Sequence, residues 1–567
     1  MRKRKNLFKT ITLIFVVSIY TLSCSDDYVE INPTGSLNPN VLNNLEGLDA
    51  LLLAAYGGLD GLTGGVTGLG WQNDHTNWLY GEVASDNALK GSSIGDQPDM
   101  NLIEQGEMSP ASPYMDALWG SIYEGVSRAN TVLQVLANTE GLSDADKNRI
   151  EGEARFLRAH YFHYGRRYFD RIPFIDENVT DFRVPNDRDI FSDIEADYQM
   201  AITKLPLDPT QVGRAHISAA QASLAKLYLD EGNFAAAKPL LDAIINSGRY
   251  RLFDNYNDNF VTANEQAITN TEFIFQIQSL SRQELNGRLV NGIAQLHGCC
   301  GFLQPSQNLV NAHKTDANGL PLLDTFNDVD LANDQGIATS EPFTPAADNL
   351  DPRLDYTVAR RGIPFLDFDI NLLAGDANLF PGQDFVVDQV TYGPYRAKKF
   401  LPDKGEVDGG SFLGVSNVNY SIHRYADILL LRAEVAVEEN DLTTALNLVN
   451  MVRNRAKDSE IIRFQDGTPA ANYLIEPYAN FPDQAFALKA VRFERRLELA
   501  LEGHRWYDLV RWGIAEATML EYFRTEGRPL LDAFGTFTSN YMPIPASQID
   551  ITRDDNGNPT LVQNPDY

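Results

Sequence analysis

One helical pattern occurs twice in this chain, at 219–248 and at 427–456, and it restricts the possible folds more than any other feature. In the first copy, small and apolar residues recur at helical spacing on both sides of a turn at Gly232. The second copy keeps the apolar face, and Asn440 replaces the turn glycine as a residue that tolerates left-handed backbone. The pattern matches the tetratricopeptide helix–turn–helix unit of about 34 residues. It predicts a helical solenoid.

Other segments with helical spacing support this interpretation. They are 44–59, 114–136, 143–169 (where Ser143 is a typical N-cap) and 486–512, which turns at Gly503. Any one unit could be an unrelated helical hairpin. Together they favour a mostly α-helical fold built as a tetratricopeptide-like solenoid.

The solenoid is predicted to contain a large insertion. Between 253 and 420, short β-rich runs such as Glu272–Ile277 alternate with turn dipeptides. We therefore expect a loop-rich, β-containing insertion, and long loops on a rigid scaffold often carry binding sites. The expected division of the chain is a signal peptide at 1–23, a tether at 24–44, a helical part at 45–252 with a binding loop at 57–112, the insertion at 253–420 and a second helical part at 421–567.

The N-terminus has the pattern of an export signal. A basic stretch, 1–10, precedes an apolar run of 12 residues, 11–22, and Cys24 follows. That run is too short to span a bilayer as a helix, which needs about 20 residues, but it suits a signal peptide. The pattern resembles a bacterial lipoprotein signal in which Cys24 is lipidated. An ordinary secretory signal with a chance cysteine is the alternative.

Charge excludes one class of partner. The formal net charge is −30, and such a surface repels phosphate backbones, so we expect no nucleic-acid partner. Membrane attachment is expected only through the lipid anchor. The chain has three cysteines, too few for a four-cysteine zinc site.

The sequence contains no catalytic signature. Gly91–Gly95 fits G-x-S-x-G around Ser93, but its flanks are typical of a loop rather than of the strand and helix that a nucleophile elbow needs. Metalloprotease, P-loop, dinucleotide-binding and EF-hand motifs are missing from the sequence. We predict a protein that is not an enzyme and has no cofactor and no metal.

Aromatic and planar polar residues follow a glycine-rich loop. Seven glycines fall within 57–70, and Trp71, Asn73, Asp74 and Trp78 come directly after. The apolar C–H face of a sugar ring stacks on an aromatic plane, and its hydroxyls bond to amides and carboxylates. The segment therefore predicts glycan binding, although either tryptophan could instead fill the core.

Two adjacent cysteines lie between glycines, at Cys299 and Cys300. They either stay free or form a vicinal disulfide, whose flat apolar surface could serve as a stacking platform. We favour the disulfide and count both residues among the candidate glycan-binding residues.

Several longer motifs together resemble the SusD/RagB family of Bacteroidetes surface glycan-binding lipoproteins. The resemblance covers essentially the whole mature chain. Its most specific motifs are 495–513, RRLELALEGHRWYDLVRWG, and the ending 542–545 with 563–565. The other motifs are 153–162, 168–173, 351–354 and 424–434.

Membership of this family would imply about four tetratricopeptide-like helix pairs carrying a loop-rich glycan-binding half. It would also imply a non-catalytic protein that is lipid-anchored at the outer membrane, faces the cell exterior and caps a SusC-type TonB-dependent transporter. The ligand would be an oligo- or polysaccharide. The resemblance adds Arg361, Tyr392 and Tyr395 to the candidate glycan-binding residues. The alternative function is a secreted polysaccharide hydrolase on a helical scaffold.

Overall fold

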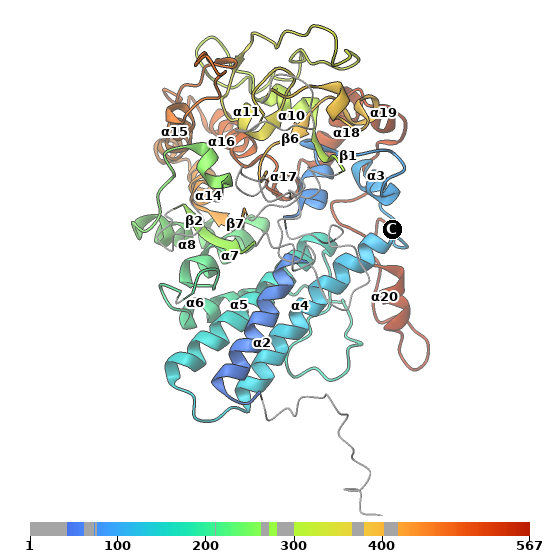
Figure 1. The fold of residues 1–567 in the computed structure, drawn as a ribbon. Helices are drawn as coiled ribbons and strands as arrows, with labels where there is room; N and C mark the ends of the chain where they lie inside the picture. Colours follow the sequence, from blue (N-terminus) through green and yellow to red (C-terminus); the bar gives the residue numbers. More distant parts are fainter. Residues whose placement is uncertain are drawn as a thin grey trace, which may run out of the picture.

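The computed structural model describes residues 42–61, 73, 76–209, 211–261, 272–279, 300–365, 379–401 and 418–567. Helices dominate this part of the chain and the strands are short (Figure 1), which confirms the predicted mostly α fold. Long helices pack side by side in one array. In packing order they are α4 (Pro113–Ala137), α5 (Asp144–Phe169), α6 (Phe191–Lys204), α7 (Ile217–Asp230), α8 (Phe234–Asn246), α14 (Tyr425–Glu438), α15 (Leu442–Asp458) and α16 (Gln484–Leu499).

The array continues across the insertion. Helix α8 packs on α7 and also on α14, although the insertion separates α8 from α14 in the chain. The two sequence copies therefore become α7–α8 and α14–α15, and they are direct neighbours. Gly232 (φ 66°) and Asn440 (φ 58°) adopt left-handed backbone at the two equivalent turns. The predicted repeat and its glycine-to-asparagine exchange are confirmed.

Local signals set where helices begin. Ser143 is the N-cap of α5, and its hydroxyl accepts a hydrogen bond from Asp146 N at 3.1 Å. Helix α2 (Leu45–Gly57) starts at Asn44, whose side chain accepts from Gly47 N. It packs along α4 and α5 (Figure 1).

The third predicted helix pair differs from the other two. Helix α17 (Arg505–Arg511) is short, and it packs on the π-helical turn η5 (Trp78–Val83). The Glu82 carboxylate explains this, because it accepts hydrogen bonds from Gly503 N at 2.7 Å and His504 N at 3.1 Å, at the start of α17. The second helix of this unit is thus anchored to the N-terminal part of the chain.

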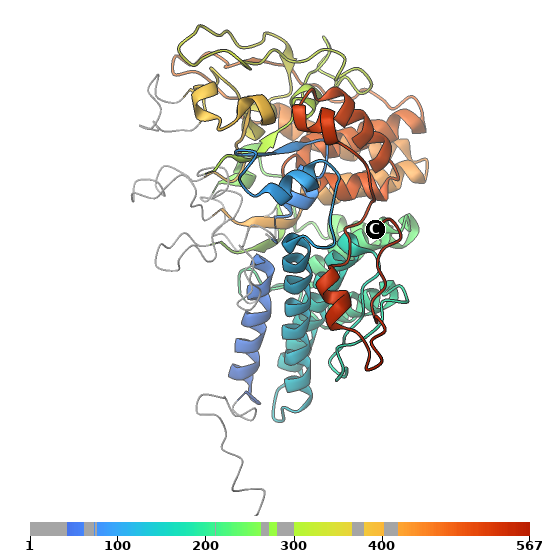
Figure 2. The same ribbon diagram turned by 90° about the vertical axis from the view of Figure 1, so that its right-hand side faces the viewer.

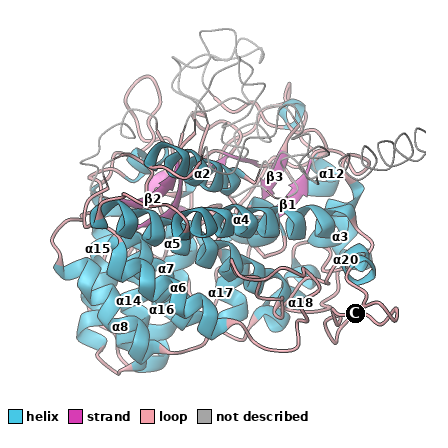
Figure 3. Cartoon of the chain, turned by 90° about the horizontal axis from the view of Figure 1, so that it is seen from below, coloured by secondary structure: helices cyan, strands magenta, loops and turns pink. Residues whose placement is uncertain are grey.

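The strands form four separate two-stranded sheets in the described part of the chain. Seen from below, β1, β2 and β3 lie on the opposite side of α4 from α14 and α16 (Figure 3). The pairs are β1 (Ala88–Gly91) with β3 (Phe302–Pro305), β2 (Phe273–Ile277) with β7 (Tyr420–Arg424), β4 (Asn349–Leu350) with β8 (Asn472–Tyr473), and β5 (Val358–Ala359) with β6 (Arg396–Ala397).

Short helices complete the N-terminal part, the insertion and the C-terminal part. The last of them, α20, lies beside α4 near the C-terminus (Figure 2). They are α3 (Pro98–Glu104), α10 (Gln307–Ala312), α11 (Leu354–Thr357), α12 (Gln389–Tyr392), α18 (Ala515–Thr525), α19 (Pro529–Phe534) and α20 (Ala546–Ile551).

A buried ion-pair network joins the insertion to the array. The Glu498 carboxylate on α16 accepts from Arg424 at 2.6 Å and from Arg353 at 3.0 Å. Glu502 accepts from Arg424 at 2.8 Å and from Lys399 at 2.7 Å. Removing one partner of such a group leaves an uncompensated buried charge. The carboxylates of the predicted motif 495–513 therefore hold the insertion on the solenoid.

Candidate functional site

The candidate site lies at the end of the β1·β3 ladder, where the backbone is irregular. Gly91 pairs with Phe302, and Gly91, Ser92, Gly301 and Leu303 all have positive φ. The strands approach so closely that a Cβ on Gly91 would lie 2.2 Å from Gly301 O. Ser92 N donates to that same oxygen at 3.0 Å. Positive φ at non-glycine residues is uncommon and clusters at binding sites, so this ladder end is a candidate site.

A buried lysine holds the turn that follows β1. Lys90 Nζ donates to Ser93 O at 2.8 Å and to Asp96 O at 2.6 Å. Ser92 Oγ donates to Asp96 Oδ2 at 2.8 Å, which closes the same turn from the other side. The turn 92–96 is therefore held in place by Lys90, a residue of the preceding strand β1, and by Ser92.

The surroundings of Lys90 are aromatic and carry one buried acid. Its Nζ lies 5.7 Å from the Phe302 ring centroid and 5.1 Å from that of Tyr392. Burial lowers the pKa of Lys90 to about 8, and the nearby Glu104 carboxyl opposes this shift. Burial raises the pKa of Glu104 to about 8, which Lys90 opposes.

Apolar side chains are exposed around this turn. Ile94 (53%), Val387 (57%) and Val390 (68%) are all more than half exposed. A Cβ atom built on Gly301 would lie 3.3 Å from Val387 Cγ2. Asn101 ties the turn to α12, because its Nδ2 donates to Ile94 O at 3.0 Å and its Oδ1 accepts from Tyr392 OH at 2.6 Å.

We call this surface, formed by Ser92–Asp96, Cys300–Gly301, Val387 and Val390, the β1·β3 face. Its chemistry is apolar side chains beside backbone and hydroxyl groups that can form hydrogen bonds. Exposed apolar groups next to polar groups are the combination that a sugar ring requires.

Cys300 lies on this face and is half-buried. Its sulfur is disulfide-bonded. Cys24 and Cys299 both lie outside the described residues, so the predicted vicinal pairing stays a prediction.

Tyr392 and Tyr395 lie under the β1·β3 face. Both rings are buried. Gln304 Nε2 donates to the backbone carbonyls of Tyr392, at 3.3 Å, and Tyr395, at 3.1 Å. Tyr395 OH donates to Gln307 Oε1 at 2.9 Å. In this structure the two rings support the face from inside, and neither presents a plane on which a sugar could stack.

Arg361 occupies a different place. Its guanidinium is buried and donates to the carbonyl oxygens of Ile337 and Ala338, each at 3.0 Å. Its Nη1 also lies 3.7 Å from Asp334 Oδ2. Arg361 therefore holds the loop 337–341.

The glycine-rich segment is described only in part. Trp78 is buried in η5, and its ring centroid lies 6.1 Å from that of Phe302 in β3. Trp78 thus backs the β1·β3 ladder. Asn73 is buried and its Nδ2 donates to Gly61 O. Trp71 and Asp74 lie outside the described residues, so their predicted roles stay predictions.

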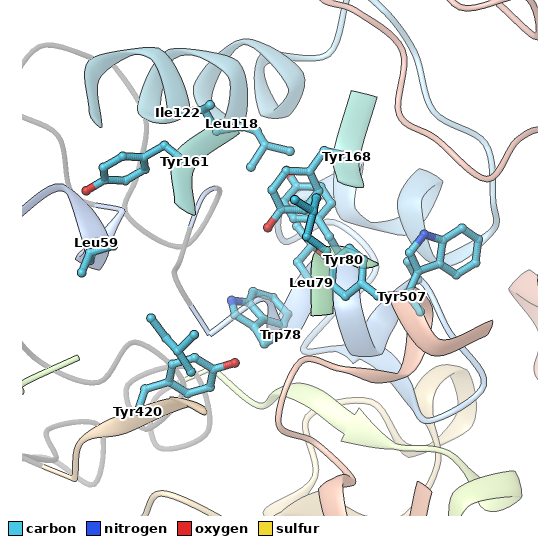
Figure 4. Close-up of a cluster of buried hydrophobic side chains, with 14 of the residues drawn as sticks. Leu59, Trp78, Leu79, Tyr80, Leu118, Ile122, Tyr161, Tyr168, Tyr420 and Tyr507 are labelled. Atoms are coloured by element: carbon cyan, nitrogen blue, oxygen red, sulfur yellow. The ribbon is translucent and has the colours of Figure 1, made fainter. Parts of the chain in front are cut away.

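Asn73 borders a cavity of about 480 Å³, a volume that includes its open mouth. Figure 4 shows several of the side chains around it, including Leu59, Leu118, Ile122, Tyr161 and Tyr168. The full lining is Gly58, Leu59, Gly61, Asn73, Asn77, Leu118, Ser121, Ile122, His160, Tyr161, Tyr164, Tyr168, Ile277 and Ile422.

The polar groups of this cavity are already engaged. Tyr161 OH donates to Ala55 O at 2.7 Å, and Tyr168 OH donates to Asn77 Oδ1. Burial lowers the pKa of His160 to about 3, with further lowering from His163 and Arg167, so the imidazole is neutral. A long polymer cannot enter a cavity of this kind, whereas it can lie along an exposed face. The β1·β3 face is therefore the better candidate for glycan binding.

The structure brings Trp78, Cys300, Tyr392 and Tyr395 to the β1·β3 unit and places Arg361 apart from it. Sequence analysis missed Lys90, the turn Ser92–Asp96 and the exposed valines. The signal was present in Gly91–Gly95, whose glycines indicate a tight turn.

Within the described ranges, no group of three histidine, cysteine, aspartate or glutamate side chains is placed to hold a metal ion. Ser223 Oγ and His423 Nε2 lie 2.7 Å apart, but both side chains are buried inside the helical array. No hydrogen-bond partner for His423 Nδ1 occurs among the residues that the structure covers. A nucleophile with its base and orienting acid is therefore not assembled at this pair.

Comparison with known proteins places these features in a family. Residues 263–567 match a family model described as "SusD family". Residues 59–229 match a second model, described as "Starch-binding associating with outer membrane". The chain is 26% identical over 568 residues to SusD-like protein P2 of Formosa agariphila, covering 95% of this chain and 97% of that protein.

Solved structures share the fold. A SusD superfamily protein from Bacteroides vulgatus superposes with a TM-score of 0.67 at 20% identity, covering 92% of this chain and 99% of that one. Surface glycan-binding protein A from Bacteroides thetaiotaomicron, solved in complex with laminarihexaose, superposes with a TM-score of 0.59 at 20% identity. That match also covers 92% of this chain and 99% of the other.

Proposed function

The chain belongs to the SusD family, and from this premise we propose that it is a cell-surface glycan-binding lipoprotein. It captures an oligo- or polysaccharide and delivers it to a SusC-type TonB-dependent transporter in the outer membrane. It does not cleave the glycan. The solenoid serves as the scaffold, and the insertion together with the N-terminal loop 57–112 provides the binding surface.

The observation that carries this proposal is the construction of the β1·β3 face. Exposed Ile94 lies on the turn held by Lys90, and exposed Val387 lies against Gly301, next to the disulfide-bonded Cys300. Exposed Val390 lies on α12, which packs on β1. Burying an exposed apolar side chain against a sugar contributes about 25 cal/mol for each Å² removed from water. The laminarihexaose complex of a protein with the same fold supports an oligosaccharide as ligand.

The membrane association that we propose depends on Cys24. In the described part of the chain no helix is both long and apolar enough to cross a membrane. The proposed anchor is lipid on Cys24, which lies outside the described residues. Cys24→Ala is then expected to abolish detergent-phase partitioning, and a variant that stays in the detergent phase at wild-type levels would contradict the anchor.

The function is tested with a polysaccharide panel. Purified full-length protein is incubated with each glycan, and bound glycan and newly formed reducing ends are measured in the same sample. Binding without new reducing ends supports capture, whereas release of reducing ends supports the alternative, a hydrolase. Co-purification with a transporter of the SusC type from native membranes tests delivery, and recovery of the protein alone would contradict it.

A further inference from the structure

Arg396 is a buried arginine at the inner edge of the β1·β3 face. It lies in β6, where it pairs with Ala359 of β5. The guanidinium carbon lies 4.5 Å from the centroid of the Phe385 ring, and Nη1 donates to Phe385 O at 3.2 Å. Only 7% of the residue is exposed. The side chain is therefore held in one place by an aromatic ring and one carbonyl group.

No carboxylate neutralises Arg396 in the part of the chain that the structure describes. Its only hydrogen bond there is the one to Phe385 O. Burial alone lowers its pKa to about 10, and no acidic side chain contributes to the shift. Buried charges in proteins are normally paired, because an unpaired one is costly. The missing counter-charge needs an explanation.

The position of Arg396 beside the β1·β3 face provides an explanation for the missing counter-charge. A Cβ atom built on Gly301 would lie 3.9 Å from Arg396 Nη2 and 4.0 Å from Ser92 N. Gly301 follows the disulfide-bonded Cys300 directly. Gly301 is itself buried, and Val387 Cγ2 lies 3.3 Å from that same position. A ligand group would therefore reach the guanidinium only where the Val387 side chain, which is 57% exposed, moves aside.

We propose that the captured glycan is acidic, and that Arg396 binds a carboxylate or sulfate group on it; this inference rests on the proposed function. A guanidinium forms short, charge-assisted and often bidentate hydrogen bonds with such groups, which a neutral sugar hydroxyl cannot match. The ligand would supply the counter-charge that Arg396 lacks among the described residues.

The net charge of −30 does not oppose this. Repulsion between exposed charges is largely screened beyond about 8–10 Å at physiological salt. A partly buried ion pair at Arg396 is screened much less. An acidic protein that takes an acidic ligand needs a local cation of this kind.

The test compares matched ligands. Full-length protein is titrated with polygalacturonate and its carboxyl-reduced form, with κ-carrageenan and its desulfated form, and with a panel of neutral polysaccharides. We expect one acidic glycan to bind about tenfold or more tightly than its neutral counterpart. The member that shows this preference, uronate or sulfate, identifies the acidic group.

Variants assign the preference to Arg396. Arg396→Gln is expected to abolish the preference for the acidic form, and Arg396→Lys to retain part of it. Arg492→Gln is the matched control, because Arg492 lies over the Trp512 ring far along the chain and outside the β1·β3 face. If Arg396→Gln does not fold, the wild-type protein decides: it should bind the acidic glycan more tightly than the carboxyl-reduced or desulfated form of the same polymer.

The outcomes separate the two proposals. If only neutral glycans bind, or if folded Arg396→Gln keeps the full preference, Arg396 is a packing residue and the inference is wrong while the proposed function stands. If neither acidic nor neutral glycans bind, both proposals fail.

Discussion

Two buried arginines in this molecule have different kinds of partner. In the network around α16, Arg424 meets carboxylates of Glu272, Glu498 and Glu502. At the β1·β3 face, Arg396 meets an aromatic ring and a carbonyl group. The exposed fractions are similar, 2% and 7%, so burial does not distinguish them. The difference lies in the counter-charge, and it separates a cation that holds the fold together from one that is available to a ligand.

The largest effect is expected from breaking the network. Arg424→Met leaves Glu498 and Glu502 buried with fewer cations, so it should lower the free energy of unfolding by about 3–5 kcal/mol. Urea unfolding followed by circular dichroism measures this. Arg524→Met is the control, since its salt bridge with Glu521 is exposed. Equal shifts for the two variants would mean that the network does not stabilise the fold.

The second prediction uses pH to compare a carboxyl group that pairs with two arginines and a carboxyl group whose pKa is set mainly by burial. Burial would raise the pKa of Asp86, but Arg496 and Arg505 lower it to about 2, so its stabilising contribution is lost as pH falls below its ordinary value of 3.8. Burial raises the pKa of Glu104 from 4.5 to about 8. The folded state therefore binds the extra proton, and stability is lost as pH rises from about 4.5 through 8.

Thermal unfolding measured across this pH range tests whether stability rises or falls with pH. Glu104→Gln should remove the share of Glu104 in the loss of stability between about pH 6 and pH 8. The shares of Glu82 and Glu526, whose pKa values burial raises to about 7, should remain. Glu107→Gln, three residues away and exposed, should leave the loss unchanged. A Glu104→Gln profile that is parallel to the wild-type profile would show that Glu104 is already ionised in the folded protein.

The fold was more predictable than the site. The repeat 219–248 and 427–456 predicted α7–α8 and α14–α15, because apolar spacing and a left-handed turn residue are properties of the local sequence. Nothing local in Gly503 could show that α17 would dock on η5, since that depends on Glu82, far away in the chain. The aromatic residues selected from sequence turned out to be buried wherever they are described, because composition does not reveal which face of a ring is covered.

The third prediction concerns the turn on the β1·β3 face. Lys90→Met removes two hydrogen bonds, to Ser93 O and Asp96 O, so the turn should loosen and glycan affinity should fall by about 3- to 30-fold. Hydrogen exchange at 92–97 should become faster. Lys489→Met, whose ion pair with Asp324 is exposed, is the control. Faster exchange with unchanged affinity would place the sugar elsewhere.

The smallest effects are expected from the exposed apolar residues. Ile94→Ser and Val390→Ser should each weaken glycan binding about two- to fivefold, because each removes a modest apolar contact. Neither should change the melting temperature, since both side chains are more than half exposed. Val329→Ser, at a site with 72% exposure outside the face, should change neither quantity.

The central claim is that the β1·β3 face captures a glycan without cleaving it, and one titration tests it most directly. Calorimetry is performed on the full-length protein and on the Ile94→Ser/Val390→Ser double variant, with reducing ends counted in the same samples. The account predicts that the wild type binds, that the double variant binds about tenfold more weakly, and that no reducing ends form. Equal affinity for the two proteins, or an accumulation of reducing ends, would contradict it.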